Sequence, residues 1–484
     1  MKLKDILKDI EIIEFCADPE MEIGGICYDS RHVKTGDLFV AVSGFETDGH
    51  KYINSAFENG AVAVLCQKAP DGGLPYVQVK DSRYALAIVS KNFFRSPSSE
   101  MVMIGVTGTN GKTTTTTLIK HMLEHCLNAK VGLVGTNENM IGYTALPAER
   151  TTPESYELQK LLREMADAGC THVVMEVSSH SLVLSRVAGI TFQVGIFTNL
   201  TQDHLDFHRT MEEYAKAKAL FFRQCEKGAV NLDDQWAEYM LREAKCPVLT
   251  YSTEKNEATL VAKDIRLYAG EVKFCALTTG VLERVRLGVP GRFSVYNALA
   301  VIACGLLLGI SSGRVAEALS AAKGVKGRVE VVPTDGDYTI LIDYAHTPDA
   351  LENVLKSMKE VSPGRLVVLF GCGGDRDRTK RPIMGKIAAE YADFVIITSD
   401  NPRTEDPLGI IADIMSGLED SKTPRTIIEN RREAIAYAIN NHRPGDIIIL
   451  AGKGHETYQI IGKTKHHMDE REIVAEILEK RKNQ

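Results

Sequence analysis

Short apolar segments alternate with longer segments of helical apolar spacing along most of this 484-residue chain. The clearest example is the apolar run 101–106, which is followed by a glycine-rich turn and then by residues 113–127, where apolar residues recur at helical spacing. Parallel strands need long crossover connections, usually helices, so this alternation predicts an α/β fold with a mostly parallel sheet. Further strand-like runs lie at 37–42, 61–66, 131–134, 172–177, 194–198, 339–342, 366–370, 394–398 and 446–450.

The pattern is interrupted twice, and the interruptions divide the chain. The polar stretch Arg95–Ser99 predicts a linker, and a second transition falls near Gly324–Arg328, after which the alternation restarts. A chain of this length corresponds to about three domains of roughly 150 residues each. We therefore expect three α/β domains, over residues 1–98, 99–327 and 328–484, of which the last is Rossmann-like.

The composition excludes several classes of protein. Apolar residues make up 44% and charged residues 25% of the chain, as in ordinary globular proteins. The formal net charge of −7 argues against a nucleic-acid-binding protein, which needs a basic surface. No apolar run approaches the roughly 20 residues that span a bilayer, and acids interrupt the N-terminal segment where a signal peptide would be apolar. The ten cysteines include no CxxC pair, so we expect neither zinc nor a disulfide framework, but a reduced, cytoplasmic protein.

The glycine-rich turn Gly105–Thr114 has the composition of a phosphate-binding loop. It departs from the common G-x-x-x-x-G-K-[ST] spacing, because Val106 stands six residues before Lys112. Its glycines still allow backbone N–H groups to face an anion at the N-terminus of the following helix. Lys112 can reach the outer phosphates of a nucleotide, and the Thr113 hydroxyl can hold Mg²⁺. A tight turn with an exposed lysine is the alternative, but the strand–turn–helix context favours nucleotide binding.

Two other predicted strands end in polar side chains. The run 172–177 carries Glu176 near its end, and an acid beside a phosphate loop is a common metal ligand, although many strands end in a solvated Glu. The segment after the run 194–198 carries a dense polar cluster that includes Asp203, His204 and His208. Open α/β sheets place their sites at the C-terminal ends of strands, so we favour a functional role for this cluster.

Together these motifs resemble the Mur ligases of peptidoglycan synthesis. The resemblance spans nearly the whole chain and includes the phosphate loop, the strand with Glu176 and the sequence NLTQDHLDFH at 199–208. It is strongest to the members that add the third residue of the stem peptide to UDP-N-acetylmuramoyl-L-alanyl-D-glutamate. Other matching motifs are Tyr28–Arg31, Tyr296–Asn297, Gly327–Glu330, Asp343–Pro348, Gly371–Arg378, Asp400–Arg403 and Gly452–Glu456.

The resemblance implies a role for each matching residue. The implied nucleotide-binding residues are Gly108, Thr109, Asn110, Gly111, Lys112, Thr113, Thr114, Asn297 and His346, with Arg328 reaching the ATP site from the third domain. The implied metal ligands are Thr113, Glu176, His204 and Lys218 as a carbamate, and the implied catalytic residues are Lys112, His204, Lys218 and Arg328. The residues implied to hold UDP-MurNAc-dipeptide are Ser30, Thr151, Thr152, Ser178 and Arg186. One polar contact of the family is expected to be missing or replaced, because Leu184 stands where some members carry Gln.

The segment after Tyr214 carries two lysines, Lys216 and Lys218. An amphipathic helix with exposed lysines is the ordinary interpretation of such a segment. In the family the lysine four residues after the tyrosine is carbamylated, which by alignment is Lys218. A neutral amine attacks CO₂ and becomes an anion that can bind Mg²⁺, and this requires a lowered lysine pKa, which burial and nearby cations provide.

The motif Asp400–Asn401–Pro402–Arg403 bears on the amino acid that is added. Members with Arg at its last position resemble those that use meso-diaminopimelate, which differs from lysine by a second carboxylate. An Arg fork binds a carboxylate through paired charge-assisted hydrogen bonds, and lysine would leave buried cations unpaired. A Pro-Arg surface turn is the alternative. The expected acceptor-binding residues are Arg376, Asp400, Asn401, Pro402, Arg403, Gly452 and Glu456, of which Asp400 and Glu456 would hold the distal ammonium group.

The resemblance thus implies an ATP-dependent ligase that joins meso-diaminopimelate to a D-Glu γ-carboxylate through an acyl phosphate, and we expect it to act as a monomer on small molecules. Bringing two anions together needs Mg²⁺, Lys112 and Arg328 to neutralise charge. One alternative is another ligase of the same fold, such as a sister Mur enzyme or folylpolyglutamate synthetase. The other is a P-loop switch or binding module that uses ATP only to change conformation. The acceptor motifs argue against both.

Overall fold

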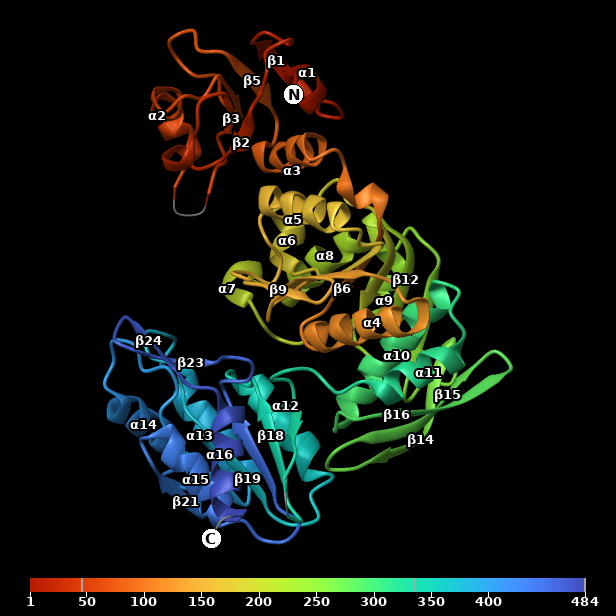
Figure 1. Cartoon of the computed structure of the whole chain (residues 1–484), viewed down its shortest axis with the longest axis vertical. Coiled ribbons are helices and arrows are strands. Elements are labelled where there is room, and N and C mark those ends of the chain that lie inside the picture. The colour runs from red at the N-terminus through yellow and green to blue at the C-terminus, as the bar shows by residue number, and fades with distance from the viewer. Residues whose placement is uncertain (45–46, 335, 483–484) are drawn as a thin grey trace. The chain divides into compact units, whose positions relative to one another are not determined.

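The computed structural model describes residues 1–44, 47–334 and 336–482 (Figure 1). The chain divides into two compact units: unit 1 contains residues 1–251, 257–259 and 303–311, and unit 2 contains the remaining residues. Each unit contains a mostly parallel sheet with helical connections, which confirms the predicted α/β class. The domain boundaries at 98/99 and 327/328 stay a prediction.

Unit 1 begins with a five-stranded sheet. Its elements are α1 (Leu3–Ile6), β1 (Ile12–Cys16), β2 (Gly25–Cys27), β3 (Asp37–Val40), α2 (Ile53–Glu58), β4 (Ala63–Cys66), β5 (Tyr76–Val79) and α3 (Ser82–Phe93). The strand order is β1–β5–β4–β3–β2, with β1 antiparallel to β5 and the other pairs parallel. Strands β3 and β4 lie within the apolar runs 37–42 and 61–66 and are buried at every position.

The stretch that was predicted as a linker is a fixed turn. Arg95 and Ser96 adopt left-handed backbone with φ of 61° and 51°, and residues 97–100 form a short 3₁₀ helix. Pro97 and Ser98 are buried. A polar composition indicates an exposed segment, but here the left-handed pair turns the chain and Pro97, with its fixed φ, packs against the folded unit.

The second sheet of unit 1 carries the phosphate loop. Its elements are β6 (Val102–Thr107), α4 (Lys112–Leu127), β7 (Val131–Val134), β8 (Asn139–Ile141), β9 (Thr144–Leu146), α5 (Ser155–Asp167), β10 (His172–Glu176), α6 (Ser179–Val183), β11 (Phe192–Phe197), α7 (Leu205–His208), α8 (Met211–Ala219), β12 (Cys225–Asn231), α9 (Ala237–Glu243) and β13 (Val248–Ser252). The order is β13–β12–β11–β6–β10–β7–β8–β9, parallel as far as β7 and then antiparallel. Glu176 pairs with Val106 and Phe197 with Thr107, so β6, β10 and β11 end at one edge, where open sheets bind ligands.

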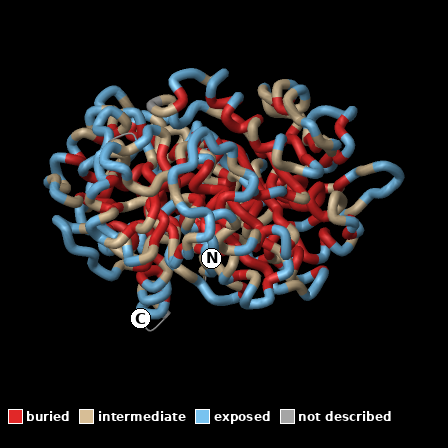
Figure 2. Tube along the Cα trace, turned by 90° about the horizontal axis from the view of Figure 1, so that it is seen from above, coloured by how far each residue is buried: buried red, intermediate tan, exposed pale blue. Residues whose placement is uncertain are grey.

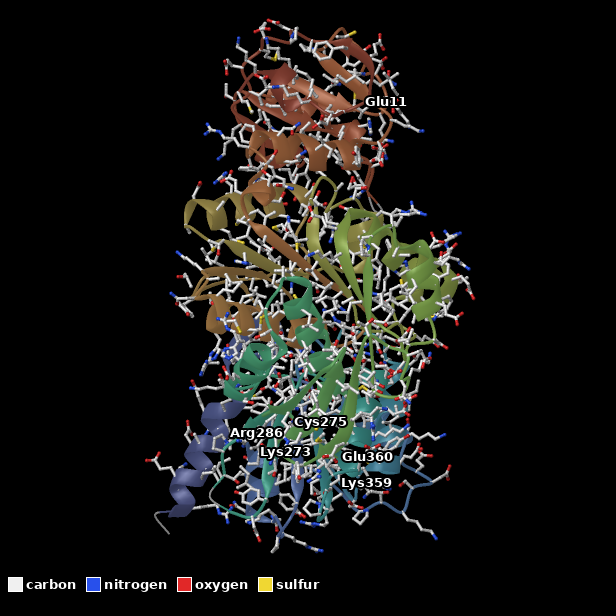
Figure 3. The ribbon with its side chains drawn as sticks, turned by 90° about the vertical axis from the view of Figure 1, so that its right-hand side faces the viewer. Glu11, Lys273, Cys275, Arg286, Lys359 and Glu360 are labelled. Atoms are coloured by element: carbon white, nitrogen blue, oxygen red, sulfur yellow. The ribbon has the colours of Figure 1, made fainter. Side chains whose placement is uncertain are left out.

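Unit 2 contains an antiparallel meander and a six-stranded sheet. The meander and its helices are β14 (Leu260–Leu267), β15 (Val272–Thr278), β16 (Val281–Leu287), α10 (Arg292–Leu307), which begins in unit 2, and α11 (Ser312–Ala321). Figure 3 labels Lys273 and Cys275 on β15 and Arg286 on β16.

The six-stranded sheet has the order β17–β18–β22–β19–β20–β21, with β17 antiparallel to β18 and the other pairs parallel. The bounds of its elements are β17 (Glu330–Val332), β18 (Thr339–Asp343), α12 (Pro348–Lys359), β19 (Leu366–Phe370), α13 (Lys380–Tyr391), β20 (Phe394–Ile397), α14 (Pro407–Ser416), β21 (Arg425–Ile427), α15 (Arg431–Asn440), β22 (Ile447–Ala451), β23 (Tyr458–Ile461), β24 (Thr464–His467) and α16 (Glu470–Lys482). Because β22 inserts between β18 and β19, the strand order changes there, and such switch points are where doubly wound sheets bind ligands.

The buried residues follow the sheets. Figure 2 shows them through the interior of the trace, with exposed residues along the outer loops. Strands β19 and β22 are buried at every position, as expected for parallel strands that helices cover on both faces. Among the residues that the structure describes, no helix has the length and apolar character needed to cross a membrane.

Candidate active site

The phosphate loop follows β6 and ends where α4 begins at Lys112. Gly111, directly before the helix, has a φ of 84°, a left-handed conformation that glycine adopts without strain. The Lys112 Nζ donates hydrogen bonds to the carbonyl oxygens of Gly108 and Thr109, both at 2.8 Å. Lys112 therefore lies across the loop at the N-terminus of a 16-residue helix, where its charge and the helix dipole both favour a phosphate.

The segment after β11 clamps this loop. The Thr198 hydroxyl donates to the Asn110 carbonyl at 2.7 Å, and the Asn199 carbonyl accepts from the Thr109 N–H at 2.9 Å. The Asn199 Oδ1 also accepts from the Asn110 N–H at 2.8 Å. A Cβ at Gly108 would meet the Thr198 Oγ1 at 1.9 Å, so this close approach requires glycine. The polar cluster after β11 was visible in the sequence, but its clamp on the loop was not.

Glu176 is 1% exposed at the end of β10, and Thr136 holds its carboxylate. The Oε1 accepts from the Thr136 N–H at 2.9 Å and the Oε2 from the Thr136 hydroxyl at 3.0 Å. The same hydroxyl lies 3.0 Å from that of Thr151, a predicted substrate-binding residue. Thr136 belongs to no motif and follows β7 in an irregular segment, so sequence reasoning missed it.

His204 belongs to a cluster of aromatic rings. Its side chain is 49% exposed, and its ring centroid lies 4.9 Å from that of His180. His208 is buried, stacks on Tyr214 with centroids 4.6 Å apart, and places its Nε2 2.8 Å from the Ser179 hydroxyl. The structure thus separates an exposed His204, which a ligand can reach, from a His208 that packs in the interior.

The two lysines of α8 have different surroundings. Lys216 is exposed, whereas Lys218 is 1% exposed, with its Nζ 4.7 Å from the centroid of the Tyr214 ring. Within the described part of the chain, the Lys218 amine forms no hydrogen bond or ion pair. Burial and then the charge of Lys112 lower the pKa of Lys218 well below its ordinary value. A neutral amine is therefore favoured at this position, and the neutral amine is the nucleophilic form of lysine.

The residues predicted to hold the dipeptide lie around the end of β10. The Thr152 hydroxyl donates to the Glu176 carbonyl at 2.8 Å and accepts from the Ser178 N–H at 3.2 Å. The Arg186 Nη1 donates to the Thr152 carbonyl at 3.3 Å, and its Nε pairs with Glu154 at 3.2 Å. The structure thus brings Thr152, Ser178 and Arg186 together, and their role towards substrate stays a prediction.

Ser30 lies in the first part of unit 1 and lines a pocket of about 600 Å³. Asp29 accepts from the Arg31 N–H at 3.1 Å and so begins the 3₁₀ turn that carries Ser30. Arg83 and Arg150 also line this pocket. A pocket of this size with several arginines can accept a ligand that carries phosphates.

In unit 2, the predicted nucleotide-binding residues Arg328 and His346 share Tyr344 as a neighbour. The Arg328 guanidinium carbon lies 5.0 Å from the centroid of the Tyr344 ring, and its Nε has no hydrogen-bond partner among the described residues. The His346 Nδ1 lies 2.8 Å from the Tyr344 carbonyl oxygen. Asn297 is buried on α10. Tyr344, which sequence reasoning did not single out, lies inside a motif that it quoted.

The predicted acceptor cations Arg376 and Arg403 both flank Gly373. A Cβ at Gly373 would lie 2.9 Å from the Arg403 Nη1 and 3.9 Å from the Arg376 Cγ. The Arg403 Nη1 donates to the Gly374 carbonyl at 2.7 Å, and the Arg376 Nη1 to the Asp375 carbonyl at 3.1 Å. In the described residues, neither guanidinium pairs with a carboxylate. Two cationic side chains that flank one glycine and have no carboxylate partner suit a carboxylate ligand.

Lys453 joins two other residues of the predicted acceptor site. It is fully buried, and its Nζ donates to the Asn401 Oδ1 at 2.9 Å and to the Glu456 Oε2 at 2.7 Å. The Asn401 Nδ2 donates to the same Glu456 oxygen at 2.9 Å. Sequence reasoning did not weigh Lys453, although it lies inside the GKGHE motif. Because Lys453 already neutralises Glu456, Asp400 is the acid of this group that has no ion pair among the described residues.

Comparison with known proteins identifies the family of the chain. Family models match the chain as Mur ligase family, catalytic domain, at residues 22–121, as Mur ligase middle domain at 106–305, and as Mur ligase, glutamate ligase domain, at 327–454. The chain belongs to the Mur ligase family. A relative from Caldanaerobacter subterraneus subsp. tengcongensis is 50% identical over 481 residues, which cover 99% of both chains. A relative from Clostridium botulinum is 46% identical with the same coverage, and both are named UDP-N-acetylmuramoyl-L-alanyl-D-glutamate–2,6-diaminopimelate ligase.

Solved structures of Mur ligases have the same fold. One that is described as a UDP-N-acetylmuramoyl-L-alanyl-D-glutamate–2,6-diaminopimelate ligase has a TM-score of 0.74 and 32% identity, over 100% of this chain and 99% of that one. The MurF ligase from Thermotoga maritima in complex with ADP has a TM-score of 0.62 and 21% identity, over 96% and 99% of the two chains, which shows the fold alone. The predicted family and fold are therefore confirmed.

Proposed function

We propose that this chain is an ATP-dependent ligase that joins meso-diaminopimelate to the D-Glu γ-carboxylate of UDP-N-acetylmuramoyl-L-alanyl-D-glutamate, a step of peptidoglycan synthesis. Relatives that are 42–50% identical over nearly their full length carry the name of this ligase. The structural observation that carries the proposal concerns Arg376 and Arg403: their side chains flank Gly373, and neither guanidinium has a carboxylate partner among the described residues. We also propose that the protein acts as a monomer in the cytoplasm.

In the first step, a carboxylate oxygen of D-Glu attacks the γ-phosphorus of ATP. The bond from that phosphorus to the bridging oxygen breaks, so ADP leaves and an acyl phosphate forms. Both reactants are anions, so catalysis depends on positive charge around the phosphates and on positioning. Lys112 and the N-terminus of α4 supply such charge in unit 1, and the clamp from Thr198 and Asn199 keeps the loop in shape. Asn297, Arg328 and His346 are proposed to bind the nucleotide as well.

Thr113, Glu176, His204 and a carbamate on Lys218 would hold Mg²⁺, which when bound neutralises phosphate charge. Hydroxyl and carboxylate oxygens are the protein ligands that suit this cation. The carbamate is supported by the buried Lys218, whose amine has no hydrogen-bond or ion-pair partner among the described residues and whose pKa is lowered by burial and by Lys112. Attack of the amine on CO₂ forms an N–C bond, releases one proton and leaves an anion that the Lys112 charge favours.

In the second step, a neutral amine of diaminopimelate attacks the acyl carbon, the carbon–oxygen bond to phosphate breaks, and the amine loses a proton. Arg376 and Arg403 bind the second carboxylate of the acceptor, and the unpaired Asp400 binds the ammonium group beside it. Lysine lacks that carboxylate and would leave both cations unpaired. The loss of one such charged hydrogen bond costs about 1.5–3 kcal/mol, or about 10- to 150-fold in kcat/KM.

Phosphate release with ATP and UDP-N-acetylmuramoyl-L-alanyl-D-glutamate tests the proposal, with meso-diaminopimelate, L-lysine, other amino acids or no acceptor. We expect turnover with diaminopimelate and a product whose mass rises by that of the acceptor less one water. Turnover with lysine would keep the ligase and reject the acceptor assignment, and turnover with another amino acid would indicate a sister ligase. ADP release without a gain in product mass would favour an ATP-driven switch instead.

A further inference from the structure

Arg381, in the first turn of α13, is fully buried and binds carboxylates from two other segments. Its Nη1 donates to the Glu405 Oε2 at 2.9 Å and to the Asp413 Oδ2 at 2.8 Å, and its Nη2 donates to the Glu405 Oε1 at 2.8 Å. The Nη2 also donates a longer hydrogen bond to the Gly373 carbonyl oxygen, at 3.3 Å. A buried guanidinium is costly unless carboxylates and hydrogen bonds surround it, so this arrangement holds several segments in place.

The ion pair with Glu405 connects the two turns that carry the acceptor cations. These acceptor turns are residues 373–376 and 401–405. The Glu405 Oε1 accepts from the Asp375 N–H at 2.5 Å, and the Asp375 carboxylate accepts from the Thr404 hydroxyl at 2.7 Å. Because Glu405 binds both Arg381 and the Asp375 backbone, Glu405 connects the buried arginine to the first acceptor turn.

Both acceptor turns contain backbone that needs such support. Asp375 and Arg403 have left-handed backbone with φ of 54° and 50°, a conformation that is disfavoured for residues other than glycine. The Arg376 and Arg403 side chains flank Gly373, so movement of either acceptor turn would change the positions of these cations. Relief of the strain at Asp375 and Arg403 would displace the two cations, and contacts between the turns oppose that movement.

We propose that Arg381 is a positioning residue for acceptor binding: its ion pair with Glu405 holds the two acceptor turns together and so sets the spacing of Arg376 and Arg403 for the second carboxylate of the acceptor. This inference rests on the proposed function. Cations that are already in place lose little freedom when the acceptor binds, so the same contacts give tighter binding and stronger rejection of lysine.

The test compares Glu405→Gln with a control variant, Asp446→Asn, in the same sheet. Asp446 is buried and forms an ion pair with Arg365 at 2.7 Å. Asp446 directly precedes β22 and Arg365 directly precedes β19, so the pair lies at the N-terminal ends of these strands, whereas the acceptor turns follow the C-terminal ends of β19 and β20. We expect Glu405→Gln to raise KM for diaminopimelate about 10- to 100-fold, the value of one charge-assisted hydrogen bond. KM for ATP and for the UDP substrate should change less than about twofold, and the preference for diaminopimelate over lysine should fall. Asp446→Asn should leave that preference unchanged.

A milder variant keeps the test decisive if Glu405→Gln fails to fold. Thr404→Val removes only the exposed hydroxyl that binds Asp375, and we expect it to raise KM for diaminopimelate about 2- to 10-fold. Variants that keep the wild-type KM and preference, or that change every kinetic constant alike as a folding defect would, overturn the positioning role. If the wild-type protein does not turn over diaminopimelate, that result rejects the proposed function, and this inference, which rests on it, is rejected as well.

Discussion

Replacement of Lys218 by methionine should stabilise the protein and abolish the ligase reaction. Methionine is about as long as lysine and apolar, so it suits the buried position on α8 without the amine. The amine has no hydrogen-bond partner among the described residues, and leaving such a polar group buried costs about 1–3 kcal/mol. We therefore expect the free energy of unfolding to rise by about that amount in Lys218→Met.

The measurement is urea unfolding followed by tryptophan fluorescence. The chain contains one tryptophan, Trp236, which packs against the same apolar cluster as Tyr214 of α8. Its emission therefore reports the unfolding of the part of unit 1 that surrounds Lys218. Buffers without bicarbonate and Mg²⁺ keep the wild-type lysine unmodified, so that the comparison concerns the amine itself.

The stability gain should depend on pH in a defined direction. Folding lowers the pKa of Lys218, so the unfolded chain holds the proton more tightly than the folded one. The protonation of Lys218 therefore destabilises the wild type less as the pH rises from that lowered pKa towards the ordinary lysine value of 10.5. Lys218→Met lacks this titration, so its advantage over the wild type should shrink as the pH rises towards 10.5.

Lys216→Met is the matched control, because the same substitution falls on the same helix at an exposed position. Its unfolding free energy should stay within about 0.5 kcal/mol of the wild type, and its ligase activity should be nearly normal. A gain for Lys218→Met that is independent of pH, or a loss of stability, would refute the argument from the buried amine. Normal ligase activity in Lys218→Met would remove the carbamate from the mechanism.

Three further substitutions test other parts of the site. Gly108→Ala places a Cβ against the Thr198 hydroxyl, so ADP binding measured by calorimetry should weaken at least about tenfold while the circular dichroism spectrum is unchanged. Thr136→Val removes one hydrogen bond to the Glu176 carboxylate, which is worth about 0.5–1.5 kcal/mol. It should raise the Mg²⁺ concentration for half-maximal activity about 2- to 10-fold, and an unchanged Mg²⁺ concentration would contradict the role of Thr136 in positioning Glu176. Lys453→Met leaves the mostly buried Glu456 carboxylate without its ion-pair partner. The free energy of unfolding of unit 2, followed by circular dichroism, should therefore fall by about 1–3 kcal/mol, and an unaltered value would show that the Lys453–Glu456 pair does not stabilise the fold.

The sequence was sufficient to predict those strands whose formation depends on residues that are close together in the chain. The apolar runs at 101–106, 366–370 and 446–450 predicted β6, β19 and β22 to within about two residues, because burial on both faces requires continuous apolar residues. The stretch at 95–99 does connect α3 to β6, but the burial of Pro97 and Ser98 could not be predicted, since it depends on neighbours that are distant in the chain.

The sequence by itself determined the α/β order of elements, the phosphate loop and the residue types of the acceptor motif, since each depends on residues that are close together in the chain. Tertiary structure decided which lysine of α8 is buried, because a shift of two residues moves a side chain to another side of the helix. It also placed Thr136 on Glu176 and joined Arg381 to Glu405, pairs that are 40 and 24 residues apart. Such pairs leave no local pattern, because their geometry is set by the packing of strands and helices and not by sequence spacing.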